Sequence, residues 1–141
     1  MTENTYLLGI DFGTESVRAA IFDLAGHPVS FAATTYRTTH PHPGWAEQDP
    51  EEWWEALQAS CRKVIAASGV SPAAIKGISY DATTMTVVAM DKRGEALRPA
   101  IMWMDVRATE QAARAEKSDS VARLYNGRGT APAPAEWYPF Q

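Results

Sequence analysis

Residues 9–18 read GIDFGTESVR, and this stretch decides the fold. Asp11 closes a short apolar run, and a glycine turn with two hydroxyl residues follows it. Gly13 lets a phosphate group approach the backbone, while Thr14 and Ser16 add hydroxyl and backbone N–H donors. Asp11 suits a hydrated Mg²⁺, which prefers one or two carboxylates together with water and phosphate. The pattern predicts a phosphate-binding turn, and a plain hairpin with a glycine turn is the alternative.

Strands and one long helix are predicted around this turn. Short turns separate three apolar runs, which indicates an antiparallel meander. The three strands are residues 5–11, 16–23 and 28–36. A helix is predicted over 50–68, because Asp49 is a good N-cap and Pro50 suits the first helical position. Its apolar face is predicted to hold Trp54, Leu57, Cys61, Val64 and Ile65.

The second half of the chain continues with shorter elements. Strands are predicted at 74–81 and 85–91, followed by an extended piece at 97–103. Asp105 is placed as the N-cap of a helix over 106–117, and a short helix is predicted near 119–125. Because a helix between strands makes the next strand parallel, the fold class is mixed α/β with a mixed sheet. A pure Rossmann pattern would alternate strand and helix from the start.

Composition excludes several classes of protein. The chain has 141 residues, 45% of them hydrophobic, with a formal net charge of −4, which is a globular balance. It lacks a basic cluster, so we expect no nucleic-acid partner, and it lacks a long apolar run, so we expect no membrane span. A single cysteine, Cys61, excludes an internal disulfide, and a cytoplasmic location is expected.

Three segments together resemble one family. The pattern D-x-G-T-x-S-x-R, with a second acid at Asp23, resembles the first phosphate loop of the FGGY carbohydrate kinases. GWAEQDPEEWW at 44–54 resembles the signature before a helix of that family, and LRPAIMWMDVRA at 97–108 resembles its sugar-side segment. The resemblance implies an actin-like ATPase (ribonuclease H-like) domain that binds ATP and Mg²⁺.

The resemblance also implies roles for individual residues. Asp11 would act through Mg²⁺, and the γ-phosphate would lie near Gly13, Thr14, Ser16 and Arg18. The implied sugar contacts are Asp81, Thr84, Trp103, Asp105, Arg107 and Glu136. Alternatives stay open for three of these residues: a helix N-cap for Asp105, a surface ion pair for Arg107, and a strand-end carboxylate that orders its turn for Asp81.

The substrate implied by the resemblance is a ketose or polyol. DATTMT at 81–86 resembles the segment of ribulokinase-like members. The Arg-Glu pair of glycerol kinases and the Met-His pair of xylulokinases are not found near Thr83 and Thr84. Trp-x-Asp-x-Arg at 103–107 also favours a pentulose, so ribulose or a related ketose or polyol is expected.

The resemblance covers only part of a complete kinase. Complete relatives have two domains, and 1–141 resembles part of the first, without the general base or the second phosphate segment. We therefore expect the chain to be an N-terminal fragment, inactive alone and marginally soluble because of exposed apolar sheet, and its full-length parent to form a homodimer. The alternatives are a non-catalytic actin-like module that binds phosphate or assembles, and a pseudogene product.

Overall fold

The computed structural model describes residues 5–118. The elements follow one another in this order: β1 (Tyr6–Phe12), β2 (Ser16–Asp23), β3 (Pro28–Thr35), β4 (Glu47–Gln48), α1 (Pro50–Ser68), a 3-10 turn η1 (Pro72–Ala74), β5 (Ile75–Ala82), β6 (Ala100–Ile101) and α2 (Thr109–Ser118). These residues divide into two compact units, one built from the stretches up to Arg37 and from Glu51 to Thr83, the other from Thr38–Pro50 and from Thr84 onward.

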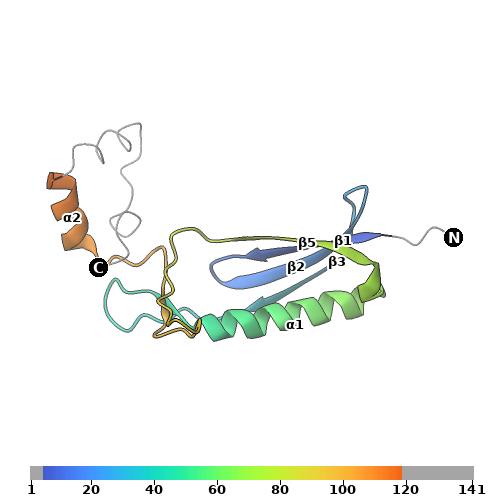
Figure 1. Cartoon of the computed structure of the whole chain (residues 1–141), viewed down its shortest axis with the longest axis horizontal. Coiled ribbons are helices and arrows are strands. Elements are labelled where there is room, and N and C mark those ends of the chain that lie inside the picture. Colours follow the sequence, from blue (N-terminus) through green and yellow to red (C-terminus); the bar gives the residue numbers. More distant parts are fainter. Residues whose placement is uncertain (1–4, 119–141) are drawn as a thin grey trace. The chain divides into compact units, whose positions relative to one another are not determined.

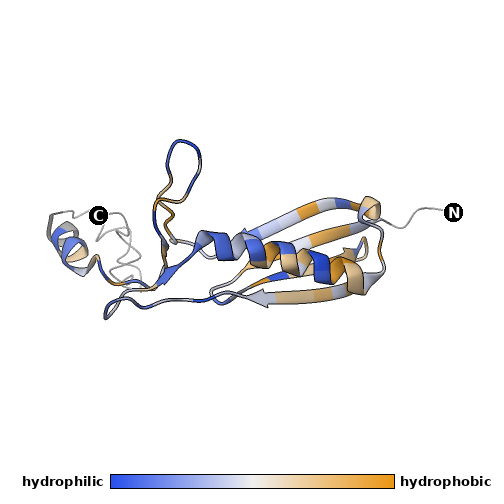
Figure 2. Ribbon diagram, turned by 90° about the horizontal axis from the view of Figure 1, so that it is seen from below, coloured by the Kyte–Doolittle hydropathy of each residue, from blue (hydrophilic) through white to orange (hydrophobic). Residues whose placement is uncertain are grey.

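The first unit is a four-stranded mixed sheet covered by one helix. Its strand order is β3-β2-β1-β5, with β1 and β2 antiparallel, β2 and β3 antiparallel, and β1 and β5 parallel. The helix α1 lies along one face of the sheet in both views (Figures 1 and 2). The predicted meander, crossover helix and parallel strand are therefore confirmed.

Strand alternation builds the core between the sheet and α1. Successive side chains of a strand point to opposite faces, and Val17, Ala19 and Ile21 of β2 all point to the α1 side and are fully buried. Small residues of α1, Ala56 and Ser60, let the helix come close to the sheet. The Ser60 hydroxyl donates to the carbonyl of Val17 (3.3 Å).

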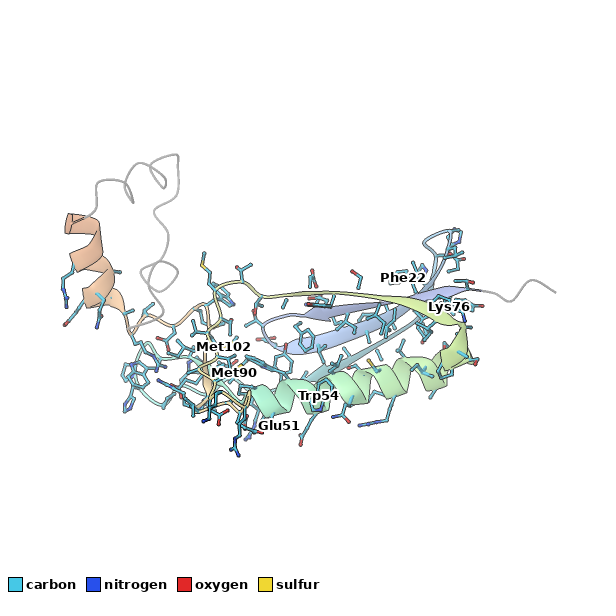
Figure 3. The ribbon with its side chains drawn as sticks, in the orientation of Figure 1. Phe22, Glu51, Trp54, Lys76, Met90 and Met102 are labelled. Atoms are coloured by element: carbon cyan, nitrogen blue, oxygen red, sulfur yellow. The ribbon has the colours of Figure 1, made fainter. Side chains whose placement is uncertain are left out.

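The prediction that Trp54 belongs to the apolar face of α1 is wrong. Trp54 is 56% exposed, and its neighbour Trp53 packs against the core instead. The buried stripe of the helix is centred on Ala56, Ser60 and Val64. Trp53 lies about two turns before Ser60 and so shares this stripe, whereas Trp54 is turned about 100° further around the helix. Trp54 is labelled on α1 in Figure 3.

Part of the first unit's apolar surface is uncovered. Ile78 and Tyr80 of β5 pair in register with Leu8 and Ile10 and so share the α1 face, yet they are 66% and 76% exposed. In the sheet of the described residues β5 is an edge strand, with one row of backbone groups unpaired by any strand. Phe31, on the opposite face, is also exposed.

As far as residue 118, the second unit combines a two-stranded sheet and α2 with irregular chain. In this sheet β4 pairs antiparallel with β6, and a single bridge joins Val87 to Ile101. The predicted strand 85–91 is wrong, because only isolated bridges form there and Met85 adopts a left-handed φ of 61°, which interrupts extended chain. Figure 3 labels Met102, which is buried in this unit, and Met90, which is exposed.

The last described helix begins later than predicted. α2 starts at Thr109, three residues after the predicted start, so Asp105 is not its N-cap. The predicted short helix at 119–125 lies outside the described residues. Within residues 5–118, neither helix combines the length and the apolar character that crossing a lipid bilayer requires.

Candidate functional site

The turn between β1 and β2 presents a carboxylate and a guanidinium side by side. Asp11 near the end of β1 is in register with Arg18 of β2, and the Arg18 Nε lies 3.1 Å from the Asp11 Oδ2. Both side chains alternate with core residues, so they lie on the face of the sheet opposite α1. They are 43% and 47% exposed, which leaves both accessible to a ligand.

Because Gly13 has no side chain, only its backbone lies beside the Asp11–Arg18 pair. Its N–H donates to the carbonyl of Ser16 (3.0 Å), which closes the turn. A Cβ at this position would overlap the guanidinium of Arg18, so only glycine lets Arg18 lie over the backbone here. Ser16 is the first residue of β2 and pairs with Thr35 of β3.

Tyr36 holds the same turn from the α1 side of the sheet. Its hydroxyl donates to the carbonyl of Gly13, and its N–H donates to the carbonyl of Glu15 (3.1 Å). Burial, with a smaller effect of the Asp11 charge, raises the pKa of Tyr36 to about 12. The sequence analysis missed this residue, because nothing local marks the end of β3 as adjacent to a turn more than twenty positions earlier.

Asp81 lies beside Asp11 in the first unit, whereas the other described sugar candidates belong to the second unit. It is in register with Asp11 on the parallel strand β5, and register partners in a sheet point to the same face. The Asp81 side chain is exposed and makes no ion pair within residues 5–118. Asp11 and Asp81 thus place two carboxylates at the carboxyl ends of two parallel strands, where ligands of open α/β sheets bind. Their oxygens suit Mg²⁺.

In the second unit, a turn presents Trp103. The N–H of Met102 donates to the carbonyl of Ala46 (3.0 Å), and the N–H of Asp105 donates to the carbonyl of Met102 (2.9 Å). The Asp105 Oδ2 accepts from the N–H of Ala46 (2.7 Å). Trp103 therefore lies at a turn that is fixed at both ends, and its side chain is 38% exposed.

Asp105 and Arg107 form a buried ion-pair network with Glu47. The Arg107 Nη2 lies 2.7 Å from the Glu47 Oε1 and 2.7 Å from the Asp105 Oδ2, and Arg98 also pairs with Glu47. Asp105 is 1% exposed, and the Arg107 side chain is 11% exposed. The alternative of a surface ion pair for Arg107 is therefore wrong.

Charge and aromatic contacts stabilise the ionised forms in this network. Burial alone would raise the pKa of the Asp105 carboxyl, but hydrogen bonds from Arg107 and from the Ala46 N–H outweigh it and lower the pKa. Burial would lower the pKa of Arg107, yet Asp105 and Glu47 raise it overall. The Arg107 guanidinium also lies 3.7 Å from the ring centroid of Trp45, at cation–π distance.

Two candidate sugar contacts remain, Thr84 and Glu136, and the structure describes the first of them. Thr84 is exposed and belongs to the second unit. The next residue, Met85, has the left-handed φ noted above, a conformation that clusters at functional sites, and sequence reasoning gave it no role. Glu136 lies outside the described residues.

Comparisons with known proteins agree on one family. The family model described as "FGGY family of carbohydrate kinases, N-terminal domain" matches residues 6–135. A xylulose kinase of Staphylococcus epidermidis is 34% identical over 110 residues, which are 78% of this chain and 22% of the relative. A glycerol kinase of Acidovorax sp. is 33% identical over 121 residues, covering 85% of this chain and 24% of the relative.

A solved structure shows the same architecture. A xyloylose kinase from Brucella ovis superposes with a TM-score of 0.82 at 33% identity, covering 92% of this chain and 26% of that chain. The chain therefore spans about a quarter of the length of the proteins it matches.

Proposed function

We propose a function from one premise: this chain belongs to the FGGY family of carbohydrate kinases. Its mixed sheet has the actin-like ATPase fold expected from the sequence. The proposed activity, for the whole protein of which this chain matches about a quarter, is transfer of the γ-phosphoryl group of ATP to a hydroxyl of a ketose or polyol. The observation that carries it is the β1–β2 turn, where Asp11, Arg18 and the bare backbone of Gly13 lie together.

The residues of this turn fit a magnesium nucleotide. Mg²⁺, when bound, neutralises charge that develops on the transferred phosphoryl group. Asp11 would hold the ion, directly or through water, and Asp81 in register beside it offers a second carboxylate. The backbone N–H of Thr14 and the hydroxyl of Ser16 would donate to phosphate oxygens, while the Gly13 N–H closes the turn on the Ser16 carbonyl. Arg18 would exchange its Asp11 partner for a phosphate oxygen, since guanidinium groups match phosphate geometry.

The second unit would supply contacts to the sugar. The half-buried Trp103 indole offers a flat apolar surface for the C–H face of a sugar, and the exposed Thr84 offers a hydroxyl. Since the Asp105 carboxylate is buried and accepts four hydrogen bonds, we assign Asp105 and Arg107 to holding the Trp103 turn in place. Glu136 remains a proposed contact from the tail.

The proposed substrate is a pentulose such as ribulose, or a related ketose or polyol. DATTMT at 81–86 and Trp-x-Asp-x-Arg at 103–107 support the pentulose. The relatives reported above are kinases of xylulose and of glycerol, so both compounds belong in any test. We also propose a cytoplasmic location, and a homodimer for the full-length protein.

Titration of the isotope-labelled chain with Mg·ATP and with sugars, followed by NMR, tests this function. We expect Mg·ATP to shift the amide signals of Gly13, Thr14 and Ser16, and Asp11→Asn to weaken the binding. Glu55→Gln is the matched control, because it removes one negative charge at an exposed position of α1, on the other face of the sheet from Asp11.

The sugar panel is ribulose, xylulose and glycerol, with the Trp103 indole signal as the readout. A shift with ribulose or xylulose supports the ketose assignment. Nucleotide binding without any sugar response supports the non-catalytic phosphate-binding module instead. An unchanged loop at millimolar Mg·ATP contradicts the phosphate site itself.

A further inference from the structure

We propose that Tyr36 is a positioning residue that sets the direction of the phosphate-binding amide in the β1–β2 turn. The inference rests on the proposed function, in which the backbone around Gly13 and Thr14 meets a phosphate. It adds a residue that the sequence pattern does not mark and that lies on the other side of the sheet from the ligand.

The peptide between Gly13 and Thr14 links the Tyr36 hydroxyl to the direction of the Thr14 N–H. The carbonyl of Gly13 and the N–H of Thr14 belong to the same peptide, and the described chain contains no cis peptide bond. In a planar trans peptide these two groups point in opposite directions. The hydroxyl of Tyr36 donates to the Gly13 carbonyl and so holds it toward Tyr36. The N–H of Thr14 is thereby directed away from Tyr36.

The direction of the Thr14 N–H matters because the two faces of the sheet carry different side chains. Tyr36 packs with Val17 and Ala56 in the core that α1 covers. Asp11 and Arg18 point to the opposite face, because their strand neighbours Ile10 and Val17 face this core. The N–H of Thr14 therefore points to the face that carries Asp11 and Arg18, and donor, guanidinium and carboxylate converge on one side.

Tyr36 is itself held firmly enough to act as a fixed reference. It is 9% exposed, and its own N–H donates to the carbonyl of Glu15. The next residue, Arg37, donates its N–H to the Glu52 Oε2 (3.0 Å) and its Nη2 to the Glu52 Oε1 (2.8 Å). Glu52 lies in the first turn of α1, so the helix, Tyr36 and the turn form one connected set of contacts.

The hydroxyl, rather than the ring, performs this role. A phenylalanine would fill the same core space but would leave the partly buried Gly13 carbonyl without this donor. A tyrosine hydroxyl is protonated at physiological pH, and burial, which raises the pKa of Tyr36 to about 12, keeps it a donor in mildly alkaline solution as well. A deprotonated phenolate could only accept and would repel the carbonyl.

The test compares Tyr36→Phe with Tyr6→Phe in the full chain. Tyr6 lies in β1 against the same helix-covered core, and its hydroxyl makes no hydrogen bond within residues 5–118, so the second variant controls for loss of a hydroxyl. Three quantities are measured: the Kd for Mg·ATP, the amide shifts of Thr14 and Glu15, and hydrogen exchange at the Gly13 amide. We expect Tyr36→Phe to weaken Mg·ATP binding about fivefold, the scale of one hydrogen bond, and to move both shifts. Tyr6→Phe should change neither.

Other results of these measurements also uphold or overturn the role of Tyr36. Equal Kd and unchanged loop amides in Tyr36→Phe overturn the proposal. If the unmodified chain does not bind Mg·ATP, the proposed function fails, and the orienting role is judged by exchange alone. Faster exchange at Gly13 in Tyr36→Phe but not in Tyr6→Phe then upholds it, and equal exchange overturns it. Should Tyr36→Phe not fold, the hydroxyl proton of Tyr36 in the unmodified chain decides: slow exchange with solvent upholds the hydrogen bond, and fast exchange overturns it.

Discussion

Arg18 pairs with Asp11 across the β1–β2 hairpin, with the guanidinium lying directly over the bare backbone of Gly13. Both side chains are about half exposed, and exposed ion pairs contribute roughly 0–1 kcal/mol to stability. A pair of this kind can separate at small free-energy cost. On binding, Mg²⁺ would replace Arg18 as the cation beside Asp11, and phosphate would replace Asp11 as the anion beside Arg18. Each side chain would therefore keep a partner of opposite charge.

Gly13→Ala should separate ligand binding from stability. The new Cβ displaces only the flexible end of Arg18, so the free energy of unfolding should change by about 1 kcal/mol or less. Mg·ATP binding should weaken by about tenfold, because close backbone approach and the Arg18 position are both lost. Gly9→Ala in β1, the strand before the turn, is the control, since its Cβ would make an ordinary 3.4 Å contact with Phe22. Equal nucleotide affinity in both variants would contradict the phosphate site.

Tyr36 should ionise apart from the other tyrosines. The chain has five tyrosines, and ordinary ones titrate near pH 10. Because the folded pKa of Tyr36 is raised to about 12, its contribution to stability is complete below about pH 10 and is lost as the pH rises toward 12. Absorbance at about 295 nm should show one late phenolate step in the folded chain, absent in Tyr36→Phe. A single step near pH 10 for all five would show that Tyr36 is not buried.

Asp105 should make the second unit sensitive to acid. Its folded pKa is lowered, so its contribution is complete above about pH 4, the unfolded value, and is lost as the pH falls through the lower folded value. Asp105→Asn should destabilise this unit by about 3 kcal/mol, because the buried Arg107 charge then keeps Glu47 as its one carboxylate partner among the described residues. The measurement is urea unfolding from pH 3 to 7, followed at the Ala46 amide.

Glu55→Gln is the control for Asp105→Asn, since Glu55 is an exposed carboxylate of α1 without an ion pair in the described chain. Its unfolding should resemble that of the unmodified chain at every pH. An Asp105→Asn variant that keeps the full acid response would assign the response to another carboxylate.

The uncovered edge of the sheet should govern solubility. Changing both Ile78 and Tyr80 to Thr keeps residues that favour strands but removes exposed apolar area, so self-association measured by sedimentation should fall. The melting temperature should change little, since neither side chain is buried. Leu24→Thr is the control, because Leu24 is 69% exposed in a turn away from the edge. A similar gain from Leu24→Thr would show that general hydrophobicity, not the edge, drives association.

The sequence by itself determined the elements whose signals are local. The β1–β2 turn, the meander and α1 were all predictable, because glycine turns, a helix start at Pro50 and apolar periodicity act within a few residues. Gly69 follows the last residue of α1 and has a φ of 66°, the left-handed conformation in which glycine commonly ends a helix.

Only the tertiary structure decided which side chains meet. Trp53 rather than Trp54 enters the core, because the approach of α1 to the sheet depends on small residues elsewhere on the helix. Asp105 binds the N–H of Ala46, 59 positions away, instead of capping α2, and Tyr36 reaches Gly13 across 23 positions. Contacts over such separations depend on how the strands and helix pack, and hydrophobic patterning alone does not specify that packing.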